Sequence, residues 1–148
     1  MKKIKSIILI SGNGSNLCNI IKHVNSGYID MEISMVISNN PDAKGLVIAS
    51  DNKIPTLVID TSKGFDDKLS EIIEKNSIGL VVLAGFMKII SKSITDKYDG
   101  MILNLHPSLL PKHKGLDTHQ KVIQAKDKFH GASVHYVTSK LDNGPVII

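Results

Sequence analysis

The strongest chemical signal in the sequence is an asparagine and a histidine that stand two positions apart beside an apolar run. The run 101–105 is expected to form a strand, and Asn104 and His106 lie at its end. Side chains alternate along a strand, so both would point to the same side. An amide that donates a hydrogen bond beside an imidazolium that donates a proton suits a reaction that builds negative charge on an oxygen. The simpler interpretation is a histidine whose ring only makes structural hydrogen bonds in a turn. The spacing alone leaves the catalytic and the structural role open.

A carboxylate that could assist this pair occurs in the turn 141–145, Leu-Asp-Asn-Gly-Pro. An aspartate in a turn that contains glycine and proline is ordinarily a turn residue and nothing more. If Asp142 lies beside His106, however, its negative charge favours the charged imidazolium. The turn therefore offers a candidate partner for the histidine, with a purely structural role as the alternative.

A second candidate site is the loop Gly12-Asn13-Gly14-Ser15-Asn16, between an expected strand and an expected helix. Glycines let the backbone approach an anion, and a helix N-terminus presents N–H groups and partial positive charge. Ser15 and Asn16 add side-chain donors, so the loop suits a phosphate. It is neither a dinucleotide fingerprint, because Leu17 takes the place of the third glycine, nor a Walker loop. A tight turn in which Ser15 or Asn16 caps the helix explains the spacing equally well.

The elements that must position these residues alternate between apolar runs and helical patterns. Apolar or alternating runs predict strands over 6–10, 33–37, 56–59, 78–84, 101–105 and 130–138. Apolar spacings of three and four residues predict helices that begin near residues 15 and 65, and further helical stretches are expected to begin near residues 41, 91 and 118. This alternation favours an α/β fold with a doubly wound, mostly parallel sheet. A ligand of such a sheet lies beyond the carboxyl ends of the strands, which selects the loops 11–16, 84–90 and 104–115.

Composition excludes several other classes of protein. The 148 residues are 42% hydrophobic and 22% charged, which indicates one globular domain rather than a disordered, collagen-like or coiled-coil chain. No apolar stretch approaches the roughly 18 residues of a membrane helix. Cys18 is the single cysteine, so a disulfide framework or a cysteine-based zinc site is excluded and a cytoplasmic setting is expected.

The charge pattern argues against a nucleic-acid partner. All 18 strongly basic residues are lysines, scattered along the chain, with a formal net charge of +4 and only 4% aromatic residues. Such a chain lacks the basic grooves and stacking platforms that bind nucleic acid. A basic site for small anionic substrates is compatible with this pattern, so small molecules are the expected partners.

Five stretches, taken in order, resemble the phosphoribosylglycinamide formyltransferases, the folate-dependent glycinamide ribonucleotide transformylases of purine synthesis. They cover essentially the whole chain and read SGNGSNL at 11–17, LAGFM at 83–87, NLHPSLLP at 104–111, GASVH at 131–135 and LDNGP at 141–145. The third stretch is highly specific for the wider formyltransferase group. The first stretch narrows the resemblance, within that group, to the phosphoribosylglycinamide formyltransferases.

The resemblance implies a Rossmann-like formyltransferase fold and transfer of the formyl group from 10-formyltetrahydrofolate to the amine of glycinamide ribonucleotide. It implies that Asn104, His106 and Asp142 are the catalytic trio. The amine attacks the formyl carbon, and Asn104 and protonated His106 stabilise the oxyanion that forms. Asp142 keeps His106 charged and helps a water to carry the proton from the amine to the leaving nitrogen. The reaction needs no metal.

The resemblance also assigns the substrate-binding residues. It implies that the substrate phosphate binds at Gly14, Ser15 and Asn16. It implies that the folate binds at Lys63, Met87, Lys88, Ile89, Ile90 and Asn104, much of it through backbone groups, and that Pro107 and His135 support the site.

Four positions depart from the family pattern. Lys88 and, in a loose alignment, Lys63 stand where the family has arginines, and a lysine keeps the charge but loses the bidentate fork. Asp117 stands where histidine is common and His113 where an aromatic residue is usual, both in the loop beside the expected site. The two lysines bear on the affinity for the folate tail; because the whole chain lacks arginine, they are expected to reflect its composition and not a loss of function.

Three alternative functions remain open at this stage. A formyltetrahydrofolate deformylase shares the chemistry but normally carries an extra N-terminal domain. A methionyl-tRNA formyltransferase shares the stretch 104–111 but lacks this phosphate loop. A non-catalytic domain that still holds folate or a nucleotide would keep the same trio of polar residues.

The last residues, Gly-Pro-Val-Ile-Ile, read as the start of one more strand. Family members continue for some dozens of residues, so a missing C-terminal segment is expected. A sheet edge left open in this way would lower stability and activity and favour self-association. The expected oligomeric state is a monomer or a homodimer, and the expected domain is a single one over residues 1–148.

Overall fold

The structure is a computed structural model that describes residues 2–62 and 64–148. The chain divides into two compact units, Met1–Lys88 and Ile89–Ile148, called the first unit and the second unit below. Each unit carries one of the two candidate sites found in the sequence.

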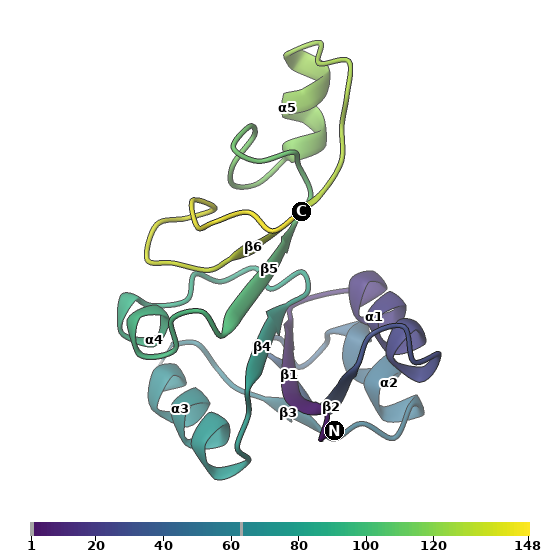
Figure 1. The fold of residues 1–148 in the computed structure, drawn as a ribbon, viewed down its shortest axis with the longest axis vertical. Coiled ribbons are helices and arrows are strands. Elements are labelled where there is room, and N and C mark those ends of the chain that lie inside the picture. Colours follow the sequence, from purple (N-terminus) through teal and green to yellow (C-terminus); the bar gives the residue numbers. More distant parts are fainter. Residues whose placement is uncertain (1, 63) are drawn as a thin grey trace. The chain divides into compact units, whose positions relative to one another are not determined.

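The first unit is a parallel sheet with helices on both faces. Its elements are β1 Ile4–Ile10, α1 Ser15–Asn25, β2 Met31–Ser38, α2 Lys44–Asp51, β3 Thr56–Val58, α3 Phe65–Lys75 and β4 Leu80–Leu83. The strands lie in the order β3-β2-β1-β4, and the pairings of β1 with β2, β1 with β4 and β2 with β3 are all parallel. α1 and α2 cover one face of this sheet and α3 covers the other (Figure 1). This is the doubly wound arrangement that the alternation of elements predicted.

The second unit is built on an antiparallel pair of strands. Its elements are α4 Lys92–Lys97, β5 Ile102–His106, α5 Thr118–Gln124 and β6 Ser133–Tyr136. β5 pairs with β6 along its length, and α5 lies beyond the end of β5 (Figure 1). The segment expected to begin another strand pairs with β6, since the Ile147 N–H donates to the Val134 carbonyl at 2.8 Å.

The core of the first unit holds the glycine-rich loop in place. The continuous apolar run at the end of β1 is fully buried, as expected for a strand covered on both faces: Ile7, Ile8, Leu9 and Ile10. α1 buries Leu17, Ile20 and Ile21, the stripe predicted by their spacing. Each fully buried side chain of this size contributes about 1.5–3 kcal/mol, so both elements that flank the loop are firmly anchored.

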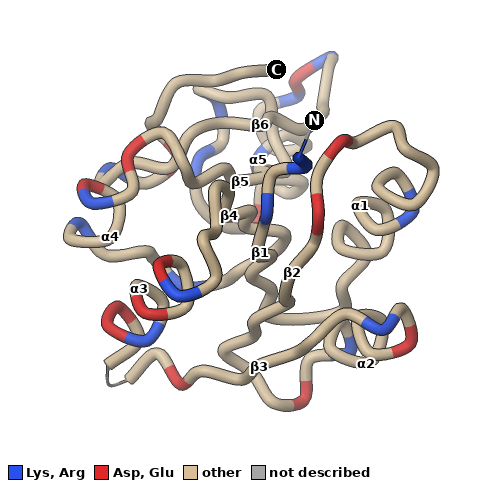
Figure 2. The backbone as a smooth tube through the Cα atoms, turned by 60° about the horizontal axis from the view of Figure 1, so that its bottom comes forward, with Lys and Arg blue, Asp and Glu red and all other residues tan. Residues whose placement is uncertain are grey.

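Charged residues are interspersed over the surface. α2, α3 and α4 each carry both lysine and acidic residues (Figure 2). Among the described residues, no helix combines the length and the apolar character needed to cross a membrane.

Candidate active site

The paired strands β5 and β6 bring together three polar side chains of the second unit, those of Asn104, His106 and His135. Asn104 and His106 share one face of β5, Asn104 lies directly opposite His135, and His106 lies opposite Ser133. His106 and His135 are 5% and 2% exposed, and their ring centroids are 6.4 Å apart. The predicted alternation along β5 is confirmed, and the partner strand adds a second buried histidine.

Asp142 joins these residues from the turn that follows β6. Its Oδ2 lies 3.5 Å from Nδ1 of His106, and its Oδ1 lies 3.7 Å from Nε2 of His135. The Gly115 N–H donates to Oδ2 at 2.8 Å. Asp142 is buried and adopts a φ of 46°, in the left-handed region that aspartate tolerates better than most residues. The structure therefore brings the three residues expected to be catalytic into one cluster, which with His135 we call the polar cluster.

The hydrogen bonds of His135 fix which of its nitrogens carries the proton. Its Nδ1 donates to the Tyr136 carbonyl at 2.9 Å, and its Nε2 accepts from Nδ2 of Asn104 at 3.1 Å. A neutral ring satisfies both contacts. An amide nitrogen carries two hydrogens, so Asn104 can donate one to His135 and the other to a substrate oxygen.

His106 faces an acceptor at each ring nitrogen. Its Nε2 donates to the His113 carbonyl at 3.1 Å, and its Nδ1 faces the Asp142 carboxylate. A doubly protonated imidazolium is the form that offers a hydrogen to both acceptors. The polar cluster thus combines an imidazole, a carboxylate and an amide donor, a set of groups that can stabilise an oxyanion and move a proton.

The glycine-rich loop of the first unit leads into α1 by a turn that requires glycine. Gly14 is the N-cap of α1 with a φ of 78°, and no side chain makes a capping hydrogen bond. The expectation that Ser15 or Asn16 caps the helix is therefore wrong. A Cβ at Gly14 would lie 2.6 Å from the Gly45 Cα, so the backbones approach too closely for any other residue. Ser15 and Asn16 are exposed in the first turn, where both can face an anion.

The residues expected to bind folate are in part accessible. Met87, Lys88 and Ile89 are exposed, whereas Ile90 is buried and Lys63 lies outside the described residues. The Met87 N–H donates to Oγ of Ser11 at 2.8 Å. Within the first unit, this bond ties the stretch after β4 to the start of the glycine-rich loop.

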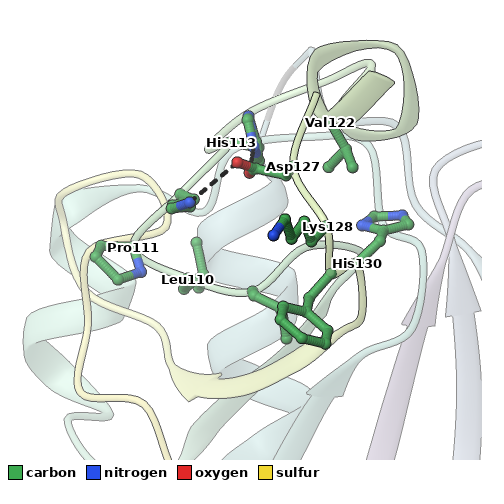
Figure 3. Close-up of a pocket in the computed structure, with 10 residues that line it drawn as sticks. Leu110, Pro111, His113, Val122, Asp127, Lys128 and His130 are labelled. Atoms are coloured by element: carbon green, nitrogen blue, oxygen red, sulfur yellow. Dashed lines mark hydrogen bonds and ion pairs between the residues drawn. The ribbon is translucent and has the colours of Figure 1, made fainter. Parts of the chain in front are cut away.

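A pocket of about 310 Å³ lies in the second unit next to the loop that carries the His113 carbonyl. It is lined by residues 109–113 and 127–130 together with Val122 (Figure 3). The polar cluster is not part of its lining. Within the described ranges, no group of three or more histidine, cysteine or acidic side chains is arranged to hold a metal ion.

Comparison with known proteins identifies the family of the chain. A family model described as formyl transferase matches residues 4–148. The chain is 44% identical, over 154 aligned residues, to the phosphoribosylglycinamide formyltransferase of Haemophilus influenzae. This alignment covers 100% of this chain and 71% of that protein. The chain belongs to the formyl transferase family. The Escherichia coli protein of the same name is 44% identical to this formyl transferase over 147 residues, 96% of the chain and 69% of that protein.

A solved structure confirms the fold expected for a formyl transferase. The phosphoribosylglycinamide formyltransferase of Coxiella burnetii superposes with a TM-score of 0.92 at 43% identity, over 99% of this chain and 71% of that one. The expected Rossmann-like α/β formyltransferase fold is therefore confirmed. The roles of the individual residues in the polar cluster remain predictions.

Some contacts in the polar cluster of this formyl transferase could not be predicted from its sequence. The His113 carbonyl and the Gly115 N–H bond the polar cluster through backbone atoms, which every residue possesses. The direct contact of His135 with both Asn104 and Asp142 was expected only as unspecified support. The alternation over 130–138 was the one available clue, because it placed Ser133 and His135 on the same face. Pro107, the other expected supporting residue, is exposed.

Proposed function

We propose that this formyl transferase moves the formyl group of 10-formyltetrahydrofolate to the primary amine of glycinamide ribonucleotide. The observation that carries the proposal is the buried contact between Asp142 and His106 beside the Asn104 amide. The names of the matched relatives support the choice of the acceptor and of the formyl group.

The polar cluster supplies each group that the transfer needs. Attack of the amine nitrogen on the formyl carbon forms a C–N bond and moves an electron pair onto the formyl oxygen. The Asn104 amide and the charged His106 ring stabilise that oxyanion. Its collapse breaks the bond to the folate nitrogen, and the amine proton reaches this nitrogen through a water held by Asp142. One formyl group and one proton exchange places, with no change of oxidation state.

The substrate sites follow the same proposal. The phosphate of glycinamide ribonucleotide binds at Gly14, Ser15 and Asn16, where the first turn of α1 offers N–H groups and partial positive charge. The folate binds along Lys63, Met87, Lys88, Ile89, Ile90 and Asn104. His135 supports the reaction by holding the Asn104 amide, and Pro107 by stiffening the exit from β5.

We further propose a cytoplasmic enzyme whose partners are small molecules, with no metal, nucleic acid or membrane involved. Residues 1–148 act as a single formyltransferase domain, in a monomer or a homodimer. The scattered lysines and the few aromatic residues argue against a nucleic-acid partner, and the single cysteine supports a reducing, cytoplasmic setting.

An acceptor-dependence assay tests the proposal. The purified chain is mixed with 10-formyltetrahydrofolate, with and without glycinamide ribonucleotide, and formation of tetrahydrofolate is followed by absorbance. The proposal predicts turnover only when the acceptor is present. Equal turnover without it, with release of formate, would identify a hydrolase of the deformylase type and overturn the proposal. Folate binding with no turnover under either condition would identify a binding domain and overturn it as well.

A further inference from the structure

The orientation of the His106 ring depends on a loop of the second unit. The ring has one contact on each side, with the Asp142 carboxylate at Nδ1 and the His113 carbonyl at Nε2. The carboxylate belongs to the polar cluster, whereas the carbonyl belongs to the loop between β5 and α5. If that carbonyl moves, the ring loses one of the two polar contacts that fix its rotation about the Cβ–Cγ bond.

The loop is folded tightly just before this carbonyl. The Ser108 hydroxyl donates to the Lys112 carbonyl at 2.7 Å, and the Lys112 N–H donates to the Leu109 carbonyl at 3.1 Å. His113 then adopts a φ of 55°, a left-handed conformation that costs a non-glycine residue energy and persists only where surrounding contacts hold it.

Asp127 supplies those contacts through both of its carboxylate oxygens. Nε2 of His113 donates to Oδ2 at 2.8 Å, and Nζ of Lys112 donates to Oδ1 at 3.1 Å. The side chains of His113 and Asp127 are 15% and 20% exposed, so this pair is far better shielded than an ordinary surface ion pair. His113 and Asp127 lie together at the pocket described above (Figure 3). Asp127 is itself fixed at the end of α5, where its N–H donates to the Val122 carbonyl at 3.2 Å.

We propose that His113 and Asp127 are positioning residues for His106. The inference rests on the proposed function, because it names the residues that keep His106 aligned for formyl transfer. Asp127 holds the His113 side chain, the His113 backbone stays in its left-handed conformation, and its carbonyl keeps Nδ1 of His106 turned toward Asp142. A shift of about 1 Å in a reacting group can cost on the order of a hundredfold in rate, so a remote carboxylate can matter to the chemistry.

Asp127→Asn is the decisive variant, because it removes the charge while keeping the size of the side chain. Asp96→Asn is its matched control. It breaks the ion pair of Asp96 with Lys92 on α4, an exposed pair of the same unit, and touches nothing in the polar cluster. Asp127→Glu restores a carboxylate. His113→Ala removes the other half of the contact, and the double variant tests whether the two residues act as one unit.

Two readouts are measured on the full chain. The first is the kinetics of formyl transfer, where Asp127→Asn is expected to lower kcat roughly ten- to a hundredfold with little change in KM for the phosphate-bearing substrate. The second is the ring ¹⁵N and ¹H NMR signals of His106, assigned by their loss in His106→Ala. A protected proton on Nε2 is expected in the unsubstituted chain and in Asp96→Asn, and its loss is expected in Asp127→Asn and His113→Ala.

The outcomes are distinct. A double variant no slower than either single variant, with rate and Nε2 signal partly restored by Asp127→Glu, would support the proposal. An Asp127→Asn variant that melts like the Asp96→Asn control and keeps both the Nε2 signal and kcat would overturn it. If the unsubstituted chain transfers no formyl group, the proposed function fails. The NMR comparison then still decides whether Asp127 orients His106.

Discussion

Nδ1 of His106 lies 3.5 Å from Oδ2 of Asp142, with both side chains about 5% exposed. A buried contact between an imidazole and a carboxylate is costly to break from one side, because the remaining polar group is left without a partner in a poorly solvated place. The pair therefore links the stability of the second unit to the chemistry that we propose for it.

Asp142→Asn tests the charge of this pair without changing the shape of the turn. Asparagine tolerates the left-handed backbone of residue 142 and keeps an oxygen that can accept from the Gly115 N–H. In this variant the His106 ring loses its anionic partner, so the rate of formyl transfer is expected to fall by about 10²–10⁴-fold. Steady-state kinetics measure the loss. Asp30→Asn, which removes an exposed partner of Lys3, should leave the rate unchanged. Equal rates for the two variants would place the chemistry elsewhere.

Gly14→Ala tests the glycine-rich loop. The substitution places a Cβ 2.6 Å from the Gly45 Cα at a residue with a φ of 78°. It should cost about 1–2 kcal/mol in the free energy of unfolding and raise the KM for glycinamide ribonucleotide. Gly12→Ala is the control, since a Cβ there would meet no atom within 4 Å. Phosphate titration by NMR should shift the amides of residues 14–16 first, and a response confined to other loops would refute the proposed phosphate site.

Gly144→Ala is expected to displace the turn that carries Asp142. A Cβ at this position would lie 1.8 Å from the Tyr136 carbonyl oxygen, so the backbone must move. The cost should reach about 3 kcal/mol, the upper range for overpacking, and activity should fall with it. Gly100→Ala bears only the cost of a φ of 73°, with no atom within 4 Å of its new Cβ. Chemical denaturation compares the two variants, and an equal loss of stability would show that the close contact at Gly144 is relaxed easily.

The sequence predicted the helices and strands better than the contacts between the loops and turns at their ends. The buried run of β1 and the stripe of α1 were readable because apolar spacing reports burial directly. The shared face of Asn104 and His106 followed from strand alternation alone. The position of Asp142 beside His106 did not, because it depends on how a turn folds back 36 residues later; the residue types made Asp142 a candidate partner, and the family resemblance implied the contact. The need for glycine at position 14 could not be predicted for a similar reason, since Gly45, the neighbour that a Cβ there would strike, belongs to α2.

The Asp127 contact makes the stability of the second unit dependent on pH. Hydrogen bonds from His113 and then Lys112 hold the pKa of the Asp127 carboxyl below its usual value of 3.8. A depressed carboxyl pKa stabilises the folded state above the unfolded value, and this contribution disappears as the pH falls through the folded value. Asp127→Asn should therefore melt at a lower temperature than the unsubstituted chain near neutral pH, and the difference should shrink in acid, as the pH falls below 3.8 toward the lowered folded-state pKa. Melting curves near neutral pH and in acid measure it. A difference that persists unchanged in acid would mean that the carboxylate charge is not its source.

The central claim is that the polar cluster transfers a formyl group to an amine. The most direct measurement follows a ¹⁴C-labelled formyl group from 10-formyltetrahydrofolate, using the unsubstituted chain and His106→Ala at matched folding by circular dichroism. We expect the label in formylglycinamide ribonucleotide with the unsubstituted chain and a rate about 10²–10⁴-fold lower with His106→Ala. Label released as formate, or a His106→Ala variant that transfers it at the unsubstituted rate, would contradict the claim.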